Sequence, residues 1–108
     1  MAKQDTVICH YRVRRGQEAA FEELLRRHWP TLDRLGLVVG EPSRIYRGEE
    51  GGAPIYYEIF TWKDGEQGSR QAHESPEVGE IWRAMGALVE ERDGRPMFEF
   101  PHVTPLAV

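Results

Sequence analysis

The chain has 108 residues, of which 40% are hydrophobic and 30% are charged, and its formal net charge is -4 at pH 7. This length supports one compact domain (1–108) and excludes two, and the intermixed charges offer no basic surface for nucleic acid. Cys9 is the single cysteine, and no apolar segment is long enough for a membrane span or a signal peptide. We therefore expect a cytoplasmic protein with no nucleic-acid or membrane partner.

The first third of the chain predicts a strand followed by a helix. The segment TVICHYRV (6–13) is rich in β-branched and aromatic residues, which favour a strand. From residue 17 to 35, apolar residues return at the spacing of one helical face. Pro30 lies in that stretch and has no N–H, so it leaves the carbonyl of Arg26 unpaired and should bend the helix near His28.

The middle of the chain predicts a β-hairpin. LGLVVGEPSRIYRG (35–48) indicates a second strand that Gly40 and Pro42 make irregular, and PIYYEIFTW (54–62) is the clearest strand in the sequence. The EEGGA segment between them is typical of a turn. KDGEQGSRQAHE (63–74) follows, and it is polar with weak helical character.

A second helix should begin at Ser75 and Pro76, because serine favours the N-cap and proline favours the first helical position. We expect it to continue to the RDGRP segment (92–96). Its apolar residues share one face, namely Val78, Ile81, Trp82, Met85, Leu88 and Val89. MFEFPHV (97–103) then predicts the last strand.

The order strand, helix, strand, strand, helix, strand predicts an α+β, ferredoxin-like βαββαβ fold. Right-handed crossovers place both helices on one face of a four-stranded antiparallel sheet. The strand 54–62 nevertheless has two apolar faces: Tyr56, Phe60 and Trp62 lie on one, and Ile55, Tyr57 and Ile59 on the other. Since the helices can cover only one face, we expect a homodimer joined through the sheet faces.

Three segments, YYEIFTWKD, AHESPEVGEIWRAM and ERDGRPMFEFP, resemble the dimeric α/β-barrel superfamily and, within it, the antibiotic biosynthesis monooxygenase-like domains. The resemblance spans residues 7–103 and implies two sheets paired into a barrel across a dimer, with a pocket between sheet and helices. Activities in that superfamily include oxygenation of quinol-like substrates without a cofactor and oxidative degradation of haem.

The haem-degrading members use a tryptophan at the end of the third strand, an iron-ligating histidine on the following helix, and an asparagine on the first strand. Trp62 resembles the first of these and His73 the second, but the chain has no asparagine. His73 also precedes the main second helix. Haem binding or degradation is therefore the weaker alternative, and we expect no cofactor.

Oxygenation without a cofactor requires a base that deprotonates a phenol and a dry apolar pocket. The resemblance and the residue types give His73 and Glu58 as candidate catalytic residues. The candidate ligand-binding residues are Trp62, Trp82, His28 and Tyr57, with Trp29 and Tyr56 in a wider aromatic set. We expect His73 and Trp62 to border one cleft.

Structural roles compete with these functional ones. His73 can simply bond a neighbour before the helix, Trp82 fits a core stripe, and His28 can cap the carbonyl freed by Pro30. Trp62 belongs either to the dimer face or to a pocket wall.

Glu58 lies in the middle of a strand, where a carboxylate needs a partner. A structural interpretation pairs it with a residue of a neighbouring strand, with candidates Arg12, His10 and Arg44. The functional alternative is a raised pKa inside a cavity.

The four histidines show no spacing typical of metal ligands, so no metal site is expected. Two functions remain open at this point. One is a monooxygenase-like enzyme acting on a small aromatic or polyketide-like molecule. The other is a non-catalytic dimeric module for ligand binding or assembly.

Overall fold

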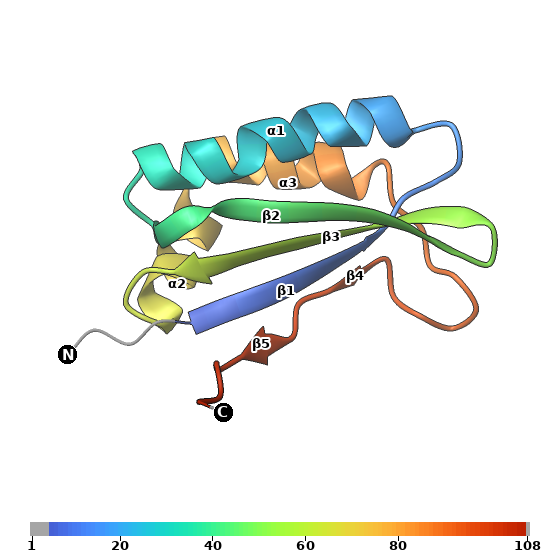
Figure 1. Ribbon diagram of the computed structural model, residues 1–108. Helices are drawn as coiled ribbons and strands as arrows, with labels where there is room; N and C mark the ends of the chain where they lie inside the picture. The colour runs from blue at the N-terminus through green and yellow to red at the C-terminus, as the bar shows by residue number, and fades with distance from the viewer. Residues whose placement is uncertain (1–4, 108) are drawn as a thin grey trace.

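The computed structural model describes residues 5–107 and has the predicted βαββαβ order, with one additional short helix (Figure 1). Its elements are β1 (Asp5–Arg12), α1 (Glu18–Arg34), β2 (Val38–Glu50), β3 (Ala53–Trp62), α2 (Glu66–Glu74), α3 (Pro76–Gly86), β4 (Phe98–Glu99) and β5 (His102–Val103). Figure 1 shows α1 and α3 side by side over one face of the sheet. The expected α+β, ferredoxin-like class is confirmed.

The strands are antiparallel and follow the order β2-β3-β1-β4, with β5 also paired to β1. The predicted last strand, 97–103, is thus divided into two short pieces along the same edge of β1. Pro101 lies at the break and cannot donate a hydrogen bond, but its carbonyl accepts one from the N–H of Ile8 at 3.0 Å.

The hairpin of β2 and β3 is irregular where the sequence predicts it. The register shifts between Val39 and Arg44, and Gly40 inside this segment has a φ of +82°, in the left-handed region. The irregularity therefore results from glycine geometry and from the missing N–H of Pro42.

Helix α3 starts as predicted but ends earlier. The Ser75 hydroxyl accepts a hydrogen bond from the N–H of Val78 at 3.3 Å, and Pro76 is the first helical residue. The helix stops at Gly86 instead of continuing to residues 92–96. The following segment pairs with the continuation of β1, since Leu88 accepts a hydrogen bond from Arg14 at 2.9 Å.

The polar segment 63–74, predicted to have weak helical character, contains a true helix, α2, at the end of the sheet where β3 ends (Figure 1). Gly68 anchors it there. A Cβ atom at this position would lie 2.5 Å from the carbonyl oxygen of Leu37 and 2.7 Å from that of Lys63. Only glycine allows α2 to lie this close to the backbone of the sheet.

Both faces of the sheet carry apolar residues, as expected. The inward face packs under the helices, where Phe60 and Trp62 are buried. On the outward face Tyr57 and Ile59 are half-buried and Tyr46 is 53% exposed. The outward face is therefore an apolar surface that α1 and α3 do not cover.

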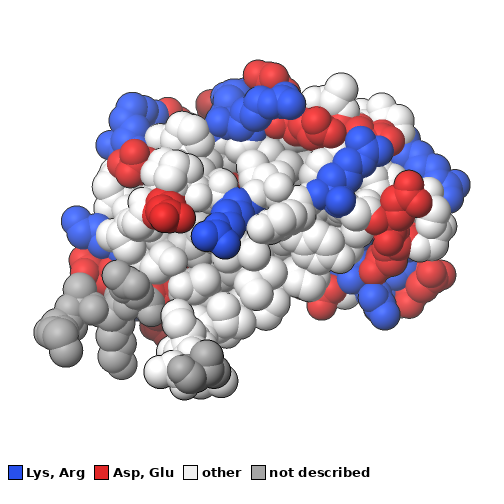
Figure 2. Space-filling model, viewed as in Figure 1, with Lys and Arg blue, Asp and Glu red and all other residues white. Residues whose placement is uncertain are grey.

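Figure 2 shows acidic and basic side chains interspersed over the face in view, without a large region of one sign. No helix within residues 5–107 has the length and apolar composition needed to cross a membrane.

Candidate functional site

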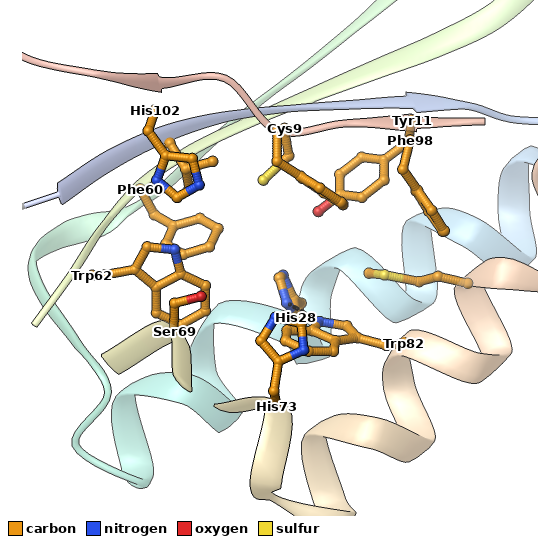
Figure 3. Close-up of a pocket in the computed structure, with 13 residues that line it drawn as sticks. Cys9, Tyr11, His28, Phe60, Trp62, Ser69, His73, Trp82, Phe98 and His102 are labelled. Atoms are coloured by element: carbon orange, nitrogen blue, oxygen red, sulfur yellow. Dashed lines mark hydrogen bonds between the residues drawn. The ribbon is translucent and has the colours of Figure 1, made fainter. Parts of the chain in front are cut away.

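A cavity of about 300 Å³ lies between the inward face of the sheet and the helices (Figure 3). Its sheet side is lined by Val7, Cys9, Tyr11, Phe60, Trp62, Phe98, Phe100 and His102. Its helix side is lined by His28, Ser69, His73, Trp82 and Met85. Apolar and aromatic side chains make up most of the sheet wall, and the helix wall adds a few polar groups, as is typical of pockets for small organic ligands.

The exposure of the lining residues shows where the cavity opens. Cys9, Phe60 and Met85 are buried, whereas His73 on α2 and His102 on β5 are exposed. The closed end therefore lies against β1, β3 and α3, and the mouth lies between α2 and the C-terminal strands. His73 and Trp62 both line the cavity, as expected of residues that border one cleft.

A chain of hydrogen bonds joins three residues of the cavity wall to the buried side chain of Glu58. The Tyr11 hydroxyl donates to Glu58 Oε1 at 2.8 Å, and His28 Nδ1 lies 2.8 Å from the same oxygen. The indole N–H of Trp82 donates to His28 Nε2 at 2.9 Å. Because Nε2 accepts, the proton of the neutral imidazole resides on Nδ1 and is donated to Glu58.

This network changes the acidity of two cavity residues. Burial, and then the negative charge of Glu58, raise the pKa of the Tyr11 hydroxyl well above its usual value. The same two causes raise the pKa of the Cys9 thiol. Both groups therefore stay protonated at neutral pH, and Cys9 is a packing residue and not a nucleophile.

His73 differs from the other polar groups of the cavity. It lies in the last turn of α2 with its ring edge-on to Trp82, at a centroid distance of 4.8 Å. No hydrogen bond joins its ring to another residue of the described range 5–107. An exposed imidazole with no hydrogen-bond partner in that range is available to a ligand at the mouth.

The structure also decides between the alternatives for the two tryptophans. Trp62 is 5% exposed and faces inward, edge-on to Phe60, so it is a cavity wall and not a residue of the outward face. Trp82 packs against the core and lines the cavity at once.

Glu58 is neither paired with the expected residues of a neighbouring strand nor placed inside the cavity. The predicted partners are wrong: Glu58 faces the helices, opposite Cys9, whereas Arg12 and His10 alternate onto the other face of the sheet. Arg44 pairs with Glu41. Glu58 is not among the residues that line the cavity, whereas its hydrogen-bond partners Tyr11 and His28 are. Both of these partners are labelled in Figure 3.

Three further aromatic candidates lie away from the cavity. Tyr57 is on the outward face, edge-on to His10, so the prediction that it lines a pocket between sheet and helices is wrong. Tyr56 donates its hydroxyl hydrogen bond to Glu22 at 2.5 Å, and Trp29 packs against the core.

His28 has a different role from the capping one considered for it. Both of its ring nitrogens are occupied by side chains, Glu58 and Trp82, and not by the carbonyl of Arg26. Helix α1 continues through Pro30 to Arg34. His28 therefore lines the cavity as a fixed member of the buried chain.

Sequence reasoning missed Tyr11, Ser69 and His102 as cavity residues. Tyr11 carried a usable signal, because Val7, Cys9 and Tyr11 alternate along one face of β1. Ser69 had none, since α2 was not predicted as a firm helix.

On the outward face, Arg12 is 2% exposed and makes an ion pair with Glu50 at 2.9 Å and with Glu99 at 2.6 Å. The hydrogen bond from Arg12 lowers the pKa of Glu50, and the same bond is the main cause that raises the pKa of the Arg12 guanidinium. Within residues 5–107 no three histidine, cysteine or acidic side chains gather in a way that suits a metal ion.

No protein-family model matches the sequence, and no curated protein matches it. Solved structures do match. A mutant of SnoaB, described as a cofactor-independent oxygenase from Streptomyces nogalater, superposes with a TM-score of 0.73 at 20% identity over 99% of this chain and 97% of that one.

A putative antibiotic biosynthesis monooxygenase from Bordetella bronchiseptica gives a TM-score of 0.72 at 19% identity, with coverages of 99% and 100%. Another from Nitrosomonas europaea gives 0.70 at 11% identity, with coverages of 98% and 93%. Identities this low establish the fold and leave the activity to the site itself. The chain therefore shares the fold of these solved structures, two of which are named putative antibiotic biosynthesis monooxygenases.

Proposed function

We propose that the protein is an oxygenase that uses O₂ to convert a small fused-ring phenol, of the kind found in polyketides, into a quinone without a cofactor. One observation carries the proposal. A cavity of about 300 Å³ has a closed apolar end and a mouth where His73 offers an imidazole with no partner among residues 5–107.

The chemistry needs no external reductant. For an anthrone in its phenolic form, a bond forms between O₂ and the ring carbon opposite the hydroxyl, and the O–O bond then breaks. One oxygen atom becomes the new quinone carbonyl. The other leaves as water with the phenolic hydrogen and the hydrogen of that carbon, so the four electrons lost by the ring reduce O₂ completely.

The protein's contribution is a base and a dry environment. His73 accepts the phenolic proton, which makes the ring electron-rich enough to react with O₂. Trp62 and Phe60 hold the flat ring, and the closed end excludes water from the reacting carbon. His28 acts through Trp82, whose indole it holds in place.

The description of SnoaB as a cofactor-independent oxygenase supports the proposal through the shared fold. The alternative is a module that binds the same ligand without chemistry. An oxygenase and a binding module would both bind the ligand, but only the oxygenase would convert it. The test must therefore measure binding and turnover.

The test supplies anthrone and O₂ to protein dialysed against a chelator, and follows oxygen uptake and anthraquinone formation. We expect turnover that His73→Ala reduces by about 10²-fold, the lower range for loss of a general base. Glu74→Ala, its exposed neighbour, is the matched control and should keep full activity. Binding of anthrone without any turnover would support the non-catalytic module.

Haem is not part of this proposal. Titration with hemin, followed by the Soret band, should show no saturable complex that depends on His73. A one-to-one complex that His73→Ala abolishes, with loss of the band on adding ascorbate, would favour the haem alternative.

We also propose that two copies associate through the outward sheet faces, because Tyr46, Tyr57 and Ile59 leave that face apolar and uncovered by helices. A stable interface of standard size buries on the order of 1,600 Å². Sedimentation equilibrium should show a dimer, and Ile59→Lys should dissociate it while Leu35→Lys, at the end of α1, should not. A concentration-independent monomer of 12.5 kDa would refute the association.

A further inference from the structure

The buried carboxylate of Glu58 is surrounded by hydrogen-bond donors but not by positive charge. Tyr11 and His28 both donate to its Oε1 at 2.8 Å, and its Oε2 has no hydrogen-bond partner within residues 5–107. A second proton on His28 would have to sit on Nε2, which already accepts the indole N–H of Trp82. His28 therefore donates as a neutral imidazole, and the residues that contact Glu58 do not balance its negative charge.

The charge of Glu58 acts on the closed end of the cavity next to Tyr11. The Tyr11 hydroxyl donates its proton to Glu58 and keeps its oxygen lone pairs for another donor. Tyr11 lines the cavity, and Figure 3 shows its hydroxyl pointing toward the space between the sheet and the helices. A ligand group that donates to this oxygen would lie about 5 to 6 Å from Glu58 Oε1, the length of two successive hydrogen bonds. An opposite charge at that separation is stabilised.

The lining of the cavity favours a cation over an anion. No lysine or arginine of residues 5–107 lines it, and the two acids bonded to lining residues are Glu58 and Asp5, the latter paired with His102 at 2.7 Å. After burial, the charge of Glu58 is the next cause that raises the pKa of Tyr11 and Cys9, so it opposes a further negative charge at the closed end. Aromatic rings, whose faces attract cations, also line the cavity: Tyr11, Phe60, Trp62, Trp82, Phe98 and Phe100.

We infer that the closed end of the cavity binds the protonated amine of an aromatic ligand, with the ammonium donating to the Tyr11 oxygen and facing the charge of Glu58. The ligand class is an arylalkylamine that is protonated at neutral pH. The inference goes beyond the proposed function, which gives the ligand no charge, and it holds for a ligand that is bound without turnover. In a phenol that also carries such an amine, the ammonium would offset the effect of Glu58 on a phenolate formed at the mouth.

The test compares two ligands of nearly the same size and shape by calorimetry at pH 7. One is 2-naphthylmethylamine, which is protonated, and the other is 2-naphthylmethanol, which is neutral. We expect the amine to bind about tenfold more tightly or better, because attraction to Glu58 and to the ring faces outweighs the cost of removing the ammonium from water. Equal affinities, or tighter binding of the alcohol, would overturn the inference. This comparison uses the unsubstituted protein and so does not depend on the folding of a variant.

Two charge-removing variants locate the ammonium. Glu58→Gln keeps the size of the side chain and an acceptor oxygen, so the affinity for the amine should fall about tenfold while that for the alcohol stays within about twofold. Asp5→Asn removes the acidic group at the mouth and should leave both affinities unchanged. If Asp5→Asn removed the preference for the amine and Glu58→Gln kept it, the ammonium would lie at the mouth and the inference would be wrong.

The outcome for the cation site is separate from that for the proposed oxygenase. The reference ligand is 2-naphthol, a phenol without an amine. Binding of 2-naphthol with no preference for the amine would refute the cation site and leave the oxygenase standing. A preference for the amine that depends on Glu58, together with no turnover of anthrone, would refute oxygenation and leave the cation site standing.

Discussion

The two faces of the sheet each bury one charged side chain, and they stabilise it in different ways. On the outward face Arg12 is surrounded by opposite charges, Glu50 and Glu99. On the inward face Glu58 is held by neutral donors, Tyr11 and His28. The carboxylates of Glu50 and Glu99 balance the positive charge of Arg12. The neutral donors Tyr11 and His28 do not balance the negative charge of Glu58, which therefore acts on neighbouring groups. The residues that hold Glu58, Tyr11 and His28, also line the cavity.

The largest expected effect comes from removing the inward charge. Glu58→Ala leaves the Tyr11 hydroxyl and the His28 N–H without acceptors and creates a void, so we expect a loss of about 3 to 5 kcal/mol in the free energy of unfolding. Urea denaturation measures it. Glu58→Gln, which keeps an acceptor oxygen, should lose much less. Equal losses in the two variants would mean that charge, and not hydrogen bonding, holds this network.

Removing the charge of Arg12 on the outward face should lower the free energy of unfolding by a smaller amount. Arg12→Met leaves Glu50 and Glu99 with access to solvent, because their side chains are 22% and 39% exposed. We expect a loss of about 1 to 3 kcal/mol in urea denaturation and unchanged affinity of the cavity for 2-naphthol. A large fall in that affinity would show that the two faces are coupled.

The outward pair also predicts a dependence of stability on pH. The pKa of Glu50 is lowered in the folded protein, so its contribution is fully present above its ordinary value of 4.5 and is lost as pH falls through the lower folded value. Unfolding free energies between pH 6 and pH 3 should fall less steeply in Arg12→Met than in the unsubstituted protein. Parallel curves would contradict this assignment.

The smallest expected effect on stability is at the cavity mouth. His73 is exposed and makes no hydrogen bond within residues 5–107, so His73→Ala should change the free energy of unfolding by less than about 0.5 kcal/mol. Its effect should appear in ligand binding and turnover instead. A loss of stability without a change in binding would make His73 a structural residue.

Much of the fold could be predicted because its signals are local. The alternation in 54–62 and the Ser75–Pro76 helix start each depend on a few adjacent residues. The early end of α3 could not be predicted, because the apolar pattern through Val89 is helical while the backbone there pairs with the distant β1. The break at Pro101 did have a local signal, because a proline cannot donate a hydrogen bond to a neighbouring strand.

The candidate site was predicted in part for similar reasons. His73, Trp62, Trp82 and His28 all line the cavity, since aromatic side chains with a few polar groups are typical of ligand pockets. The partners of Glu58 were misjudged because strand neighbours were chosen by charge and not by face. The alternation of Tyr56, Glu58 and Phe60 already places Glu58 toward the helices, where Tyr11 lies.

The close approach of α2 to the sheet at Gly68 has a consequence for how the site can change. Helix α2 carries Ser69 and His73, and it can lie this close because position 68 has no Cβ atom, which would come within 2.5 Å of the carbonyl oxygen of Leu37. A larger residue there must displace the helix, and with it the two mouth residues Ser69 and His73. The size of residue 68 therefore sets the position of α2. A substitution there can change the size of the molecule that the cavity accepts without changing any residue that lines the cavity.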